Sequence, residues 1–421
     1  MRPFHAWSLV LVTCIISMYM FSLAGATDAS TGTTDDSSVV PTATLSNGLV
    51  IPLVGLGCAS GVRKSHVLSA LEAGYRYLDT AQAYQWGYHE RDVAAAIAES
   101  PFVTRQEIFV VTKIHPENLG VTSTRRAIEG SLQQAGFGGY LDGILIHKPR
   151  CWPGACSKDP EGTWQESWKV LEEYYDKGLV KAIGICDVDN ERMLDELMQQ
   201  RIPPHIIQNW FDPFHQTHDI RQAIQAKGIL FQAYSTLGTQ WKHFRGLDQN
   251  PVLTSTTLTD MAHRHGVPGP AQVVIQWAVN KYGISVLPAS TNPQRQADNL
   301  HASFSFVPMN EQDFEVLDQM DGTAPAPSRP DPNQVAMTFT TTTRRQEEEV
   351  VQAFWVDEDG QEVPVGTIEA NRELNMNSYH GHAFVFRSSA GKLLLEHTVS
   401  RNGGRKQTVV VGDGDNDEEE L

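Results

Sequence analysis

The stretch that decides the fold is Gly74-Tyr-Arg-Tyr-Leu-Asp-Thr-Ala-Gln-Ala-Tyr84. Residues 75–78 have the apolar character of a short buried strand, and Asp79 follows directly at its carboxyl end. Tyr84 comes five residues later, in the loop that leaves the strand. Packing favours apolar side chains at such places, so it explains neither the carboxylate nor the phenol. The stretch therefore predicts a strand that delivers polar side chains to a functional face.

Two more apolar runs end in the same way. Residues 107–113 stop on a lysine, and residues 140–147 stop on a histidine. In a parallel barrel all strand carboxyl ends open on one face, and that face carries the chemistry. The candidate catalytic residues are therefore Asp79, Tyr84, Lys113 and His147.

Strand and helix patterns alternate from about residue 52 to residue 302 and make eight strand–helix units. Their length is near the ~250 residues typical of a (β/α)8 barrel, which is the predicted α/β fold. Residues 43–51 precede them and predict a hairpin that turns at Asn47-Gly48. A doubly wound sheet is the alternative. It lacks its glycine fingerprint, because Gly61 has the wrong spacing from the two preceding glycines.

Seven stretches resemble the aldo-keto reductase family, whose members are (β/α)8 barrels that bind NADPH. They fall in the family's order and cover about residues 43–320. The matching stretches are residues 45–57, 74–81, 111–113, 140–147, 182–185, 233–238 and 288–299. The resemblance implies reduction of a small aldehyde or ketone to an alcohol, by hydride transfer to carbon and proton transfer to oxygen.

The resemblance makes Tyr84 the general acid and Lys113 the cation that lowers its pKa. A free phenol has a pKa near 10, and burial raises it. An ammonium at ~4 Å contributes ~4 kcal/mol at an effective dielectric near 20, and a drop of about two units needs ~2.7 kcal/mol. Asp79 would keep Lys113 charged, and His147 would orient the substrate oxygen. The alternative is that all four are structural polar residues.

The cofactor contacts also come from the resemblance. The implied contacts are Cys186, Asp187, Gln208, Tyr234, Ser235, Leu237, Thr239, Ser290, Arg295, Asp298 and Asn299. Cys186-Asp187 replaces a Ser-Asn pair of the family, and Ala289 replaces its 2′-phosphate lysine. Arg295 can still grip a phosphate with two hydrogen bonds, so NADPH is expected over NADH, with NADH possible.

The substrate pocket is expected among loops at the carboxyl face. The tryptophans on these loops are Trp86, Trp152, Trp210 and Trp241. Residues 85–89 lengthen the loop after Tyr84, and Lys148 stands where the family often has a tryptophan. A more polar pocket than usual is therefore expected. We expect no metal site, because two imidazoles alone, such as those of His380 and His382, make a poor one.

Residues 322–347 are rich in proline and threonine and predict a linker, and residues 348–412 predict a small all-β sandwich. Two stretches of the sandwich, residues 354–362 and 377–387, resemble the β domain of the von Hippel-Lindau tumour suppressor. That resemblance implies a hydroxyproline-containing peptide or protein as partner. Ser378 and His382 match two positions of the family's pocket, whereas Val365 and Phe384 replace a tyrosine and a tryptophan. Weak binding, or a purely structural sandwich, stays open.

The start of the chain predicts entry into the secretory pathway. Residues 1–26 have the charged start, apolar stretch and small-residue site of a signal peptide, with a retained membrane anchor as the alternative. The endoplasmic-reticulum lumen or secretion is the expected location. Residues 27–42 are expected to be disordered, and residues 413–421 form an acidic tail. The net charge of −17 argues against nucleic acid as a partner.

The cysteines leave one question open. Cys151 and Cys156 are close in a loop after His147, and in an oxidising lumen they could pair. Free thiols are the alternative. Two functions are therefore carried forward: a reductase with an appended binding module, and a catalytically idle barrel that acts as a scaffold for that module.

Overall fold

The computed structural model describes ten segments of the chain. They are residues 40–151, 156–243, 245–304, 307–325, 334–341, 350–357, 360–369, 372–379, 381–400 and 406–411. The predicted signal peptide, the acidic tail, Trp152 and His380 lie outside these segments. Within them, none of the helices combines the length and the apolar character that crossing a bilayer requires.

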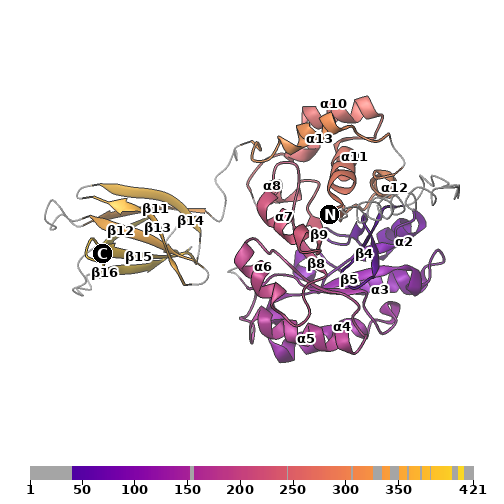
Figure 1. Ribbon diagram of the computed structural model, residues 1–421, viewed down its shortest axis with the longest axis horizontal. Coiled ribbons are helices and arrows are strands. Elements are labelled where there is room, and N and C mark those ends of the chain that lie inside the picture. The colour runs from indigo at the N-terminus through magenta and orange to yellow at the C-terminus, as the bar shows by residue number, and fades with distance from the viewer. Residues whose placement is uncertain are drawn as a thin grey trace, which may run out of the picture. The chain divides into compact units, whose positions relative to one another are not determined.

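A ring of parallel strands forms the centre of the larger, α/β part of the molecule (Figure 1). Eight strands in the described residues pair in chain order, from β3 to β10. They are β3 (Leu56–Gly57), β4 (Tyr77–Asp79), β5 (Phe109–Ile114), β6 (Gly143–Ile146), β7 (Ile183–Cys186), β8 (Ile206–Trp210), β9 (Leu230–Tyr234) and β10 (Ser285–Val286). A parallel bridge between Val54 and Val286 joins the first strand to the last. The closed ring confirms the (β/α)8 barrel and excludes the doubly wound sheet.

The barrel strands are apolar because both of their faces are covered. Every residue of β5, β6 and β7 is buried, as expected of parallel strands with helices outside and side chains inside. Strand spacing also requires a glycine at position 184. A Cβ there would lie 2.2 Å from the carbonyl oxygen of Ile206 on the neighbouring strand.

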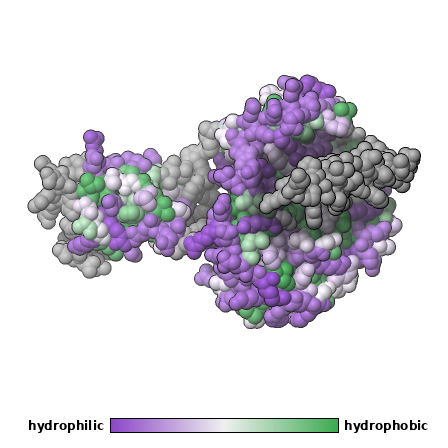
Figure 2. All heavy atoms as spheres, in the orientation of Figure 1, coloured by the Kyte–Doolittle hydropathy of each residue, from purple (hydrophilic) through white to green (hydrophobic). Residues whose placement is uncertain are grey.

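Helices surround the strands, and hydrophilic side chains cover much of the face shown in Figure 2. The longer helices are α2 (Lys64–Glu72), α3 (Glu90–Glu99), α4 (Val121–Leu132), α5 (Trp164–Asp176), α6 (Glu191–Met198), α7 (His218–Ala226), α10 (Thr256–His265), α11 (Pro270–Gln276), α12 (Pro293–His301) and α13 (Glu311–Asp318). Local signals start several of them. Thr163 and Glu166 form a capping box on α5, and Asn292 caps α12 ahead of Pro293.

The predicted hairpin is confirmed as β1 (Thr42–Thr44) and β2 (Val50–Pro52), which pair antiparallel. Leu45 and Ile51 belong to an interior cluster with Tyr77 and Phe109, the first residues of β4 and β5. The hairpin therefore packs against the amino ends of the strands, which leaves the carboxyl ends for the functional residues. β1 begins at Thr42, the last residue of the stretch expected to be disordered.

The C-terminal part is all-β, as predicted, and contains two sheets. One has the strand order β14-β11-β17 and the other β13-β12-β15-β16. The strands are β11 (Gln334–Thr341), β12 (Val351–Val356), β13 (Glu362–Ile368), β14 (Glu373–Tyr379), β15 (Ala383–Ser388), β16 (Leu393–Thr398) and β17 (Lys406–Val411). A separate apolar core includes Phe339, Val351 and Phe386.

The structure corrects the predicted linker. β11 lies inside residues 322–347 and is the central strand of its sheet. Val335, Met337 and Phe339 alternate along it and are buried, which is the period-2 pattern of a strand with one covered face. The threonines of β11, at positions 338, 340 and 341, made the segment look like a linker, although threonine is a good strand residue.

Candidate active site

The carboxyl ends of three strands meet in a buried charged group. Lys113, on β5, donates hydrogen bonds to the Asp79 carboxylate at the end of β4 and, at 3.0 Å, to the carbonyl oxygen of Thr80. Gln208, on β8, donates to the other carboxylate oxygen of Asp79 at 3.0 Å. Burial disfavours the ammonium of Lys113, but the charge and hydrogen bond of Asp79, together with Tyr88 and Cys186, outweigh burial and raise the pKa of Lys113. Lys113 therefore stays protonated at neutral pH.

His147 directly follows β6 and is held neutral. Burial, with the positive charges of Lys113 and Lys148, lowers the pKa of His147 well below its usual value. Its Nδ1 atom is buried and has no hydrogen-bond partner among the described residues. Native proteins rarely leave such an atom unpaired without a reason. A neutral imidazole with an unused nitrogen suits a site that receives a polar ligand.

The two tyrosines of the loop between β4 and α3 have different surroundings. Tyr84 is 72% exposed, and its ring contacts His89 at 4.8 Å between centroids. Tyr88 is half-buried, with its ring centroid 5.1 Å from Lys113 Nζ and 5.4 Å from the His147 ring. Burial raises the pKa of Tyr88 to about 12, and the Lys113 charge opposes this rise. The expected convergence of Tyr84 with Lys113 is thus corrected, because Tyr88 has that position.

The residues that lengthen the loop after β4 explain why Tyr88, and not Tyr84, lies beside Lys113. Tyr84 begins a short 3-10 helix, η1 (Tyr84–Trp86), which ends at Gly87 with a φ of 83°. The chain then reaches Glu90, whose carboxylate accepts hydrogen bonds from Thr112 at 2.5 Å and Ser131 at 2.7 Å. Counting forward from Asp79 selects Tyr84. Counting back from the start of α3 would have selected Tyr88.

The same loop brings two side chains against a histidine that sequence reasoning missed. The ring of Trp86 lies 4.6 Å from that of His115 and 4.8 Å from that of His147. The side-chain amide of Gln85 lies 2.7 Å from His115 Nε2. Trp86 is therefore a wall of the site, as its loop position suggested.

Two of the expected nicotinamide contacts are joined to each other. The Tyr234 hydroxyl donates to Asp187 Oδ1 at 3.0 Å, and Lys148 forms an ion pair with the other oxygen of Asp187. Asp187 has a φ of 59°, a left-handed backbone conformation that few residues other than glycine adopt. Cys186 is buried, with its sulfur 3.8 Å from Gln208 Oε1. Lys148 thus belongs to this group and lies 5.2 Å from the Tyr234 ring.

The loop after β9 carries the expected pyrophosphate contacts. Ser235 has a φ of 55°, and its hydroxyl accepts a hydrogen bond from Gln240 at 3.2 Å. The Leu237 carbonyl accepts from Asn250 at 2.6 Å, and Thr239 begins the short helix α8 (Thr239–His243). These bonds fix a turn whose backbone lies at the carboxyl face.

Trp210 and Trp241 have a structural partner. Both indole N–H groups donate to Asp212, at 2.8 and 2.9 Å, and their rings lie edge to face at 5.2 Å. Burial raises the pKa of Asp212 to about 6. Asp212 in the loop after β8 therefore joins Trp210, the last residue of β8, to Trp241 in α8, which follows β9.

The expected adenosine-phosphate contacts lie at the start of α12. Arg295 is exposed, and its Nε lies 3.5 Å from the Ser290 hydroxyl. The Asp298 side chain accepts a hydrogen bond from Gln294 at 2.9 Å. Asn299 is buried and accepts one from Gln272 at 2.8 Å. Arg295 thus faces solvent and Ser290 is half-buried, whereas the Asn299 side chain is engaged inside the protein.

The open question about the cysteines has an answer in the structure. Cys151 and Cys156 form a disulfide. Cys58 and Cys186 are free and buried.

Comparison with known proteins identifies the barrel. The model of the Aldo/keto reductase family matches residues 63–321. An aldo-keto reductase of Mycolicibacterium vanbaalenii is 33% identical over 299 residues, covering 70% of this chain and 96% of that protein. The 9,11-endoperoxide prostaglandin H2 reductase of Trypanosoma cruzi is 31% identical over 281 residues, covering 66% and 90%. The crystal structure of a Bombyx mori aldo-keto reductase in complex with NADP matches with a TM-score of 0.59 and 28% identity, covering 68% and 94%.

Proposed function

The chain belongs to the aldo/keto reductase family, and on that premise we propose that it reduces an aldehyde or ketone with NADPH, with Tyr88 as the general acid. The observation that carries the proposal is the position of the Tyr88 ring, 5.1 Å from Lys113 Nζ and 5.4 Å from the His147 ring. A phenol between a fixed ammonium and a neutral imidazole can give a proton to an oxygen that enters the same space.

A Tyr88 pKa of about 12 suits a proton donor. Hydride addition to a carbonyl leaves an alkoxide, which is about as basic as hydroxide, and water has a pKa of about 15.7. The proton transfer is then favourable by nearly four units, or roughly 5 kcal/mol. The reaction therefore does not require Lys113 to lower the pKa of the phenol to neutral values. Lys113 instead stabilises the phenolate that remains.

The other strand-end residues support that transfer. The Asp79 carboxylate pairs with Lys113 and keeps the ammonium in place. His147 is neutral, and its Nδ1 has no partner in the described part of the chain, so it would orient the substrate oxygen by a hydrogen bond. These three roles need the positions that the barrel strands impose, because a shift of one residue along a strand would point each side chain to the opposite face.

The residues at the carboxyl face fit NADPH. When bound, this cofactor would supply the hydride. The Tyr234 ring with Asp187 and Gln208 would hold the nicotinamide end, and the turn from Ser235 to Thr239 the pyrophosphate. Arg295, exposed in the first turn of α12, and Ser290, half-buried just before that helix, would hold the 2′-phosphate, which a helix N-terminus also favours. NADPH is therefore proposed over NADH.

The proposal is tested by NADPH oxidation against a panel of small aldehydes and ketones. Cofactor binding is measured separately, by quenching of intrinsic fluorescence. We expect both binding and turnover. Binding without turnover across the panel would favour the idle scaffold, and failure of NADPH to bind would reject the proposal.

One observation favours a second function, in the C-terminal part. The Ser378 hydroxyl lies 3.2 Å from His382 Nδ1, and the Trp355 ring lies 5.6 Å from the His382 ring. A buried serine, an imidazole and an indole could together receive a hydroxyproline side chain of a peptide or protein. Titrating the full chain with matched hydroxyprolyl and prolyl peptides tests this, and equal affinity for both would dismiss it.

We also propose that the chain enters the secretory pathway, as its first 26 residues predict. The Cys151–Cys156 disulfide supports this, because disulfides persist in oxidising compartments. Amino-terminal sequencing of the mature protein from cells tests it. A start at Met1 in a cytosolic fraction would contradict it.

A further inference from the structure

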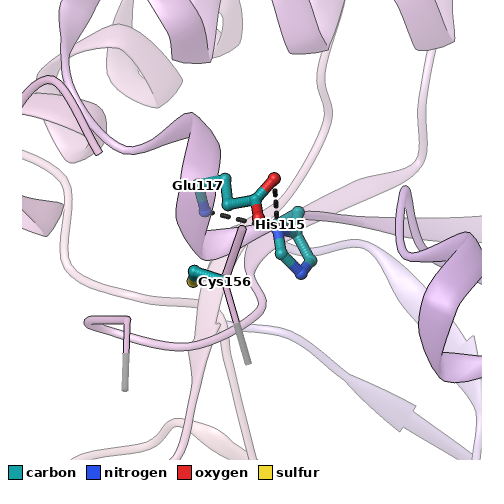
Figure 3. A group of neighbouring side chains, drawn as sticks. All are labelled: His115, Glu117 and Cys156. Atoms are coloured by element: carbon teal, nitrogen blue, oxygen red, sulfur yellow. Dashed lines mark hydrogen bonds and ion pairs between the residues drawn. The ribbon is translucent and has the colours of Figure 1, made fainter. Parts of the chain in front are cut away.

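Three side chains with metal-binding atoms meet beside the candidate active site (Figure 3). His115 follows β5, Glu117 lies in the short 3-10 helix η3 (Pro116–Asn118), and Cys156 is one half of the disulfide. One ligand atom from each lies within 4.8 Å of the other two. The proposed reductase chemistry uses none of the three.

The spacing of these atoms is close to that of a zinc site. Tetrahedral Zn²⁺ with bonds of about 2.0–2.3 Å holds neighbouring ligand atoms about 3.4–3.6 Å apart. His115 Nδ1 and Glu117 Oε2 are already 3.8 Å apart. The Cys156 sulfur lies within 4.8 Å of both other atoms, so an approach of at most about 1.2 Å brings it to the spacing of a tetrahedral site. Imidazole, carboxylate and thiolate are all ligands that Zn²⁺ accepts.

Hydrogen bonds orient His115 for this role. Its Nδ1 accepts a hydrogen bond from the Glu117 backbone N–H at 3.3 Å, so this nitrogen carries the lone pair, and a bound Zn²⁺ would replace that hydrogen bond. The proton of a neutral ring is then on Nε2, which lies 2.7 Å from the amide of Gln85. With the amide turned so that its oxygen faces Nε2, Gln85 accepts a hydrogen bond from that N–H group. Metal-bound histidines commonly donate their second N–H in this way.

Glu117 holds the cysteine close without help from the disulfide. Its Oε1 accepts a hydrogen bond from the backbone N–H of Ser157, the residue after Cys156. Its Oε2 faces His115. One oxygen therefore anchors the chain beside the sulfur, and the other remains directed at the proposed site. Breaking the disulfide leaves this anchor in place.

We propose that reduction of the Cys151–Cys156 disulfide creates a Zn²⁺ site made by His115, Glu117 and Cys156. A dithiol reductant breaks the S–S bond, yields two cysteine thiols and is itself oxidised to a disulfide. Zn²⁺ then displaces the thiol proton of Cys156 into solvent and binds the thiolate. In the oxidised protein the Cys156 sulfur is bonded to Cys151. It is therefore not a thiolate and lacks the negative charge that binds the metal.

Two matched variants test the site in the full-length chain, with Co²⁺ as the spectroscopic probe for Zn²⁺. Cys151→Ser leaves Cys156 as a free thiol, whereas Cys156→Ser leaves Cys151. Both variants lose the disulfide and keep one loop thiol. We expect Cys151→Ser to bind one Co²⁺ without reductant and to show a thiolate-to-cobalt charge-transfer band. Cys156→Ser should lack the band and bind at least about tenfold more weakly, since even outer-shell substitutions cost 10–100-fold.

Wild-type protein should show the same band only after reduction and removal of the reductant, so the test does not depend on one variant. Adding His115→Ala to Cys151→Ser should weaken binding at least about tenfold. An equal band in Cys156→Ser would overturn the proposal. So would absence of the band in both Cys151→Ser and reduced wild type, each with an unchanged circular dichroism spectrum. None of these readouts depends on reductase activity, so they can fail while the proposed function stands.

Discussion

The two tyrosines of the loop between β4 and α3 are four residues apart and experience opposite surroundings. Tyr84 is 72% exposed and has a histidine ring as its neighbour. Tyr88 is half-buried between an ammonium and an imidazole. Their side chains are chemically identical, so the surroundings alone decide which phenol can take part in proton transfer.

The difference between the two tyrosines comes from a buried charge that only one of them approaches. Lys113 is fully buried and paired with Asp79, so its charge is held in a place that water does not screen. A charge interacts more strongly across a low-dielectric interior than across water. The Tyr88 ring lies 5.1 Å from that charge, which opposes the rise that burial causes in the pKa of Tyr88. A variant that removes a buried or an exposed group of the site therefore tests how far such a difference in surroundings matters.

The largest effect is expected for Lys113→Met, which would remove the charge that distinguishes the tyrosines. It leaves the Asp79 carboxylate buried without its cation, and breaking a buried pair in this way typically costs about 3–5 kcal/mol. Urea unfolding measures the loss, and turnover should fall with it. The double variant Lys113→Met with Asp79→Asn should recover part of the stability. A loss below about 1 kcal/mol would contradict the account.

The next largest effect is expected for Arg295, an exposed cation that would bind the phosphate of NADPH. Arg295→Ala should weaken NADPH binding about ten- to hundredfold, because a charge-assisted hydrogen bond contributes about 1.5–3 kcal/mol. NADH lacks the 2′-phosphate, so its dissociation constant should not change. Fluorescence titration with both cofactors gives the answer. An equal loss for both would show that Arg295 acts on the fold and not on the phosphate.

A smaller effect is expected from pH, through His147. Its pKa is lowered, so the unfolded chain binds a proton below about pH 6.5 that the native chain does not. Stability from this group is therefore present at neutral pH and falls as the pH decreases. Between pH 7 and pH 5 wild type should lose about 1–2 kcal/mol more than His147→Gln. Parallel stability curves for the two proteins would show that His147 is not held neutral.

The smallest effect is expected for the wall of the site. Trp86→Ala would open space beside His115 and His147, so a bulky aldehyde should gain about tenfold in kcat/KM relative to a small one. Tyr84→Ala, in the same loop, should leave that ratio unchanged because the Tyr84 side chain is exposed and its ring contacts His89. Steady-state kinetics with the two aldehydes compares them. Equal changes in both variants would mean that the loop acts as a unit.

The sequence predicted the site residues that the barrel strands position and missed the site residue that a loop positions. Asp79, Lys113 and His147 were found because each ends an apolar strand, and parallel strands end on one face. Tyr88 was missed because loop length shifts a residue without changing the flanking pattern. β11 was missed for a related reason, since its threonines resemble a linker while Val335, Met337 and Phe339 make the core. Periodicity read at every second residue would have revealed it.

The central claim is tested most directly by comparing Tyr88→Phe with Tyr84→Phe in single-turnover reduction of one aldehyde at saturating NADPH. Each variant removes one hydroxyl and keeps the ring, and cofactor titration verifies that both still bind NADPH. The account predicts that Tyr88→Phe slows the reaction about 10²–10⁴-fold, the usual contribution of a positioned acid, while Tyr84→Phe stays within about twofold of wild type. A large loss in Tyr84→Phe with normal turnover in Tyr88→Phe would contradict it.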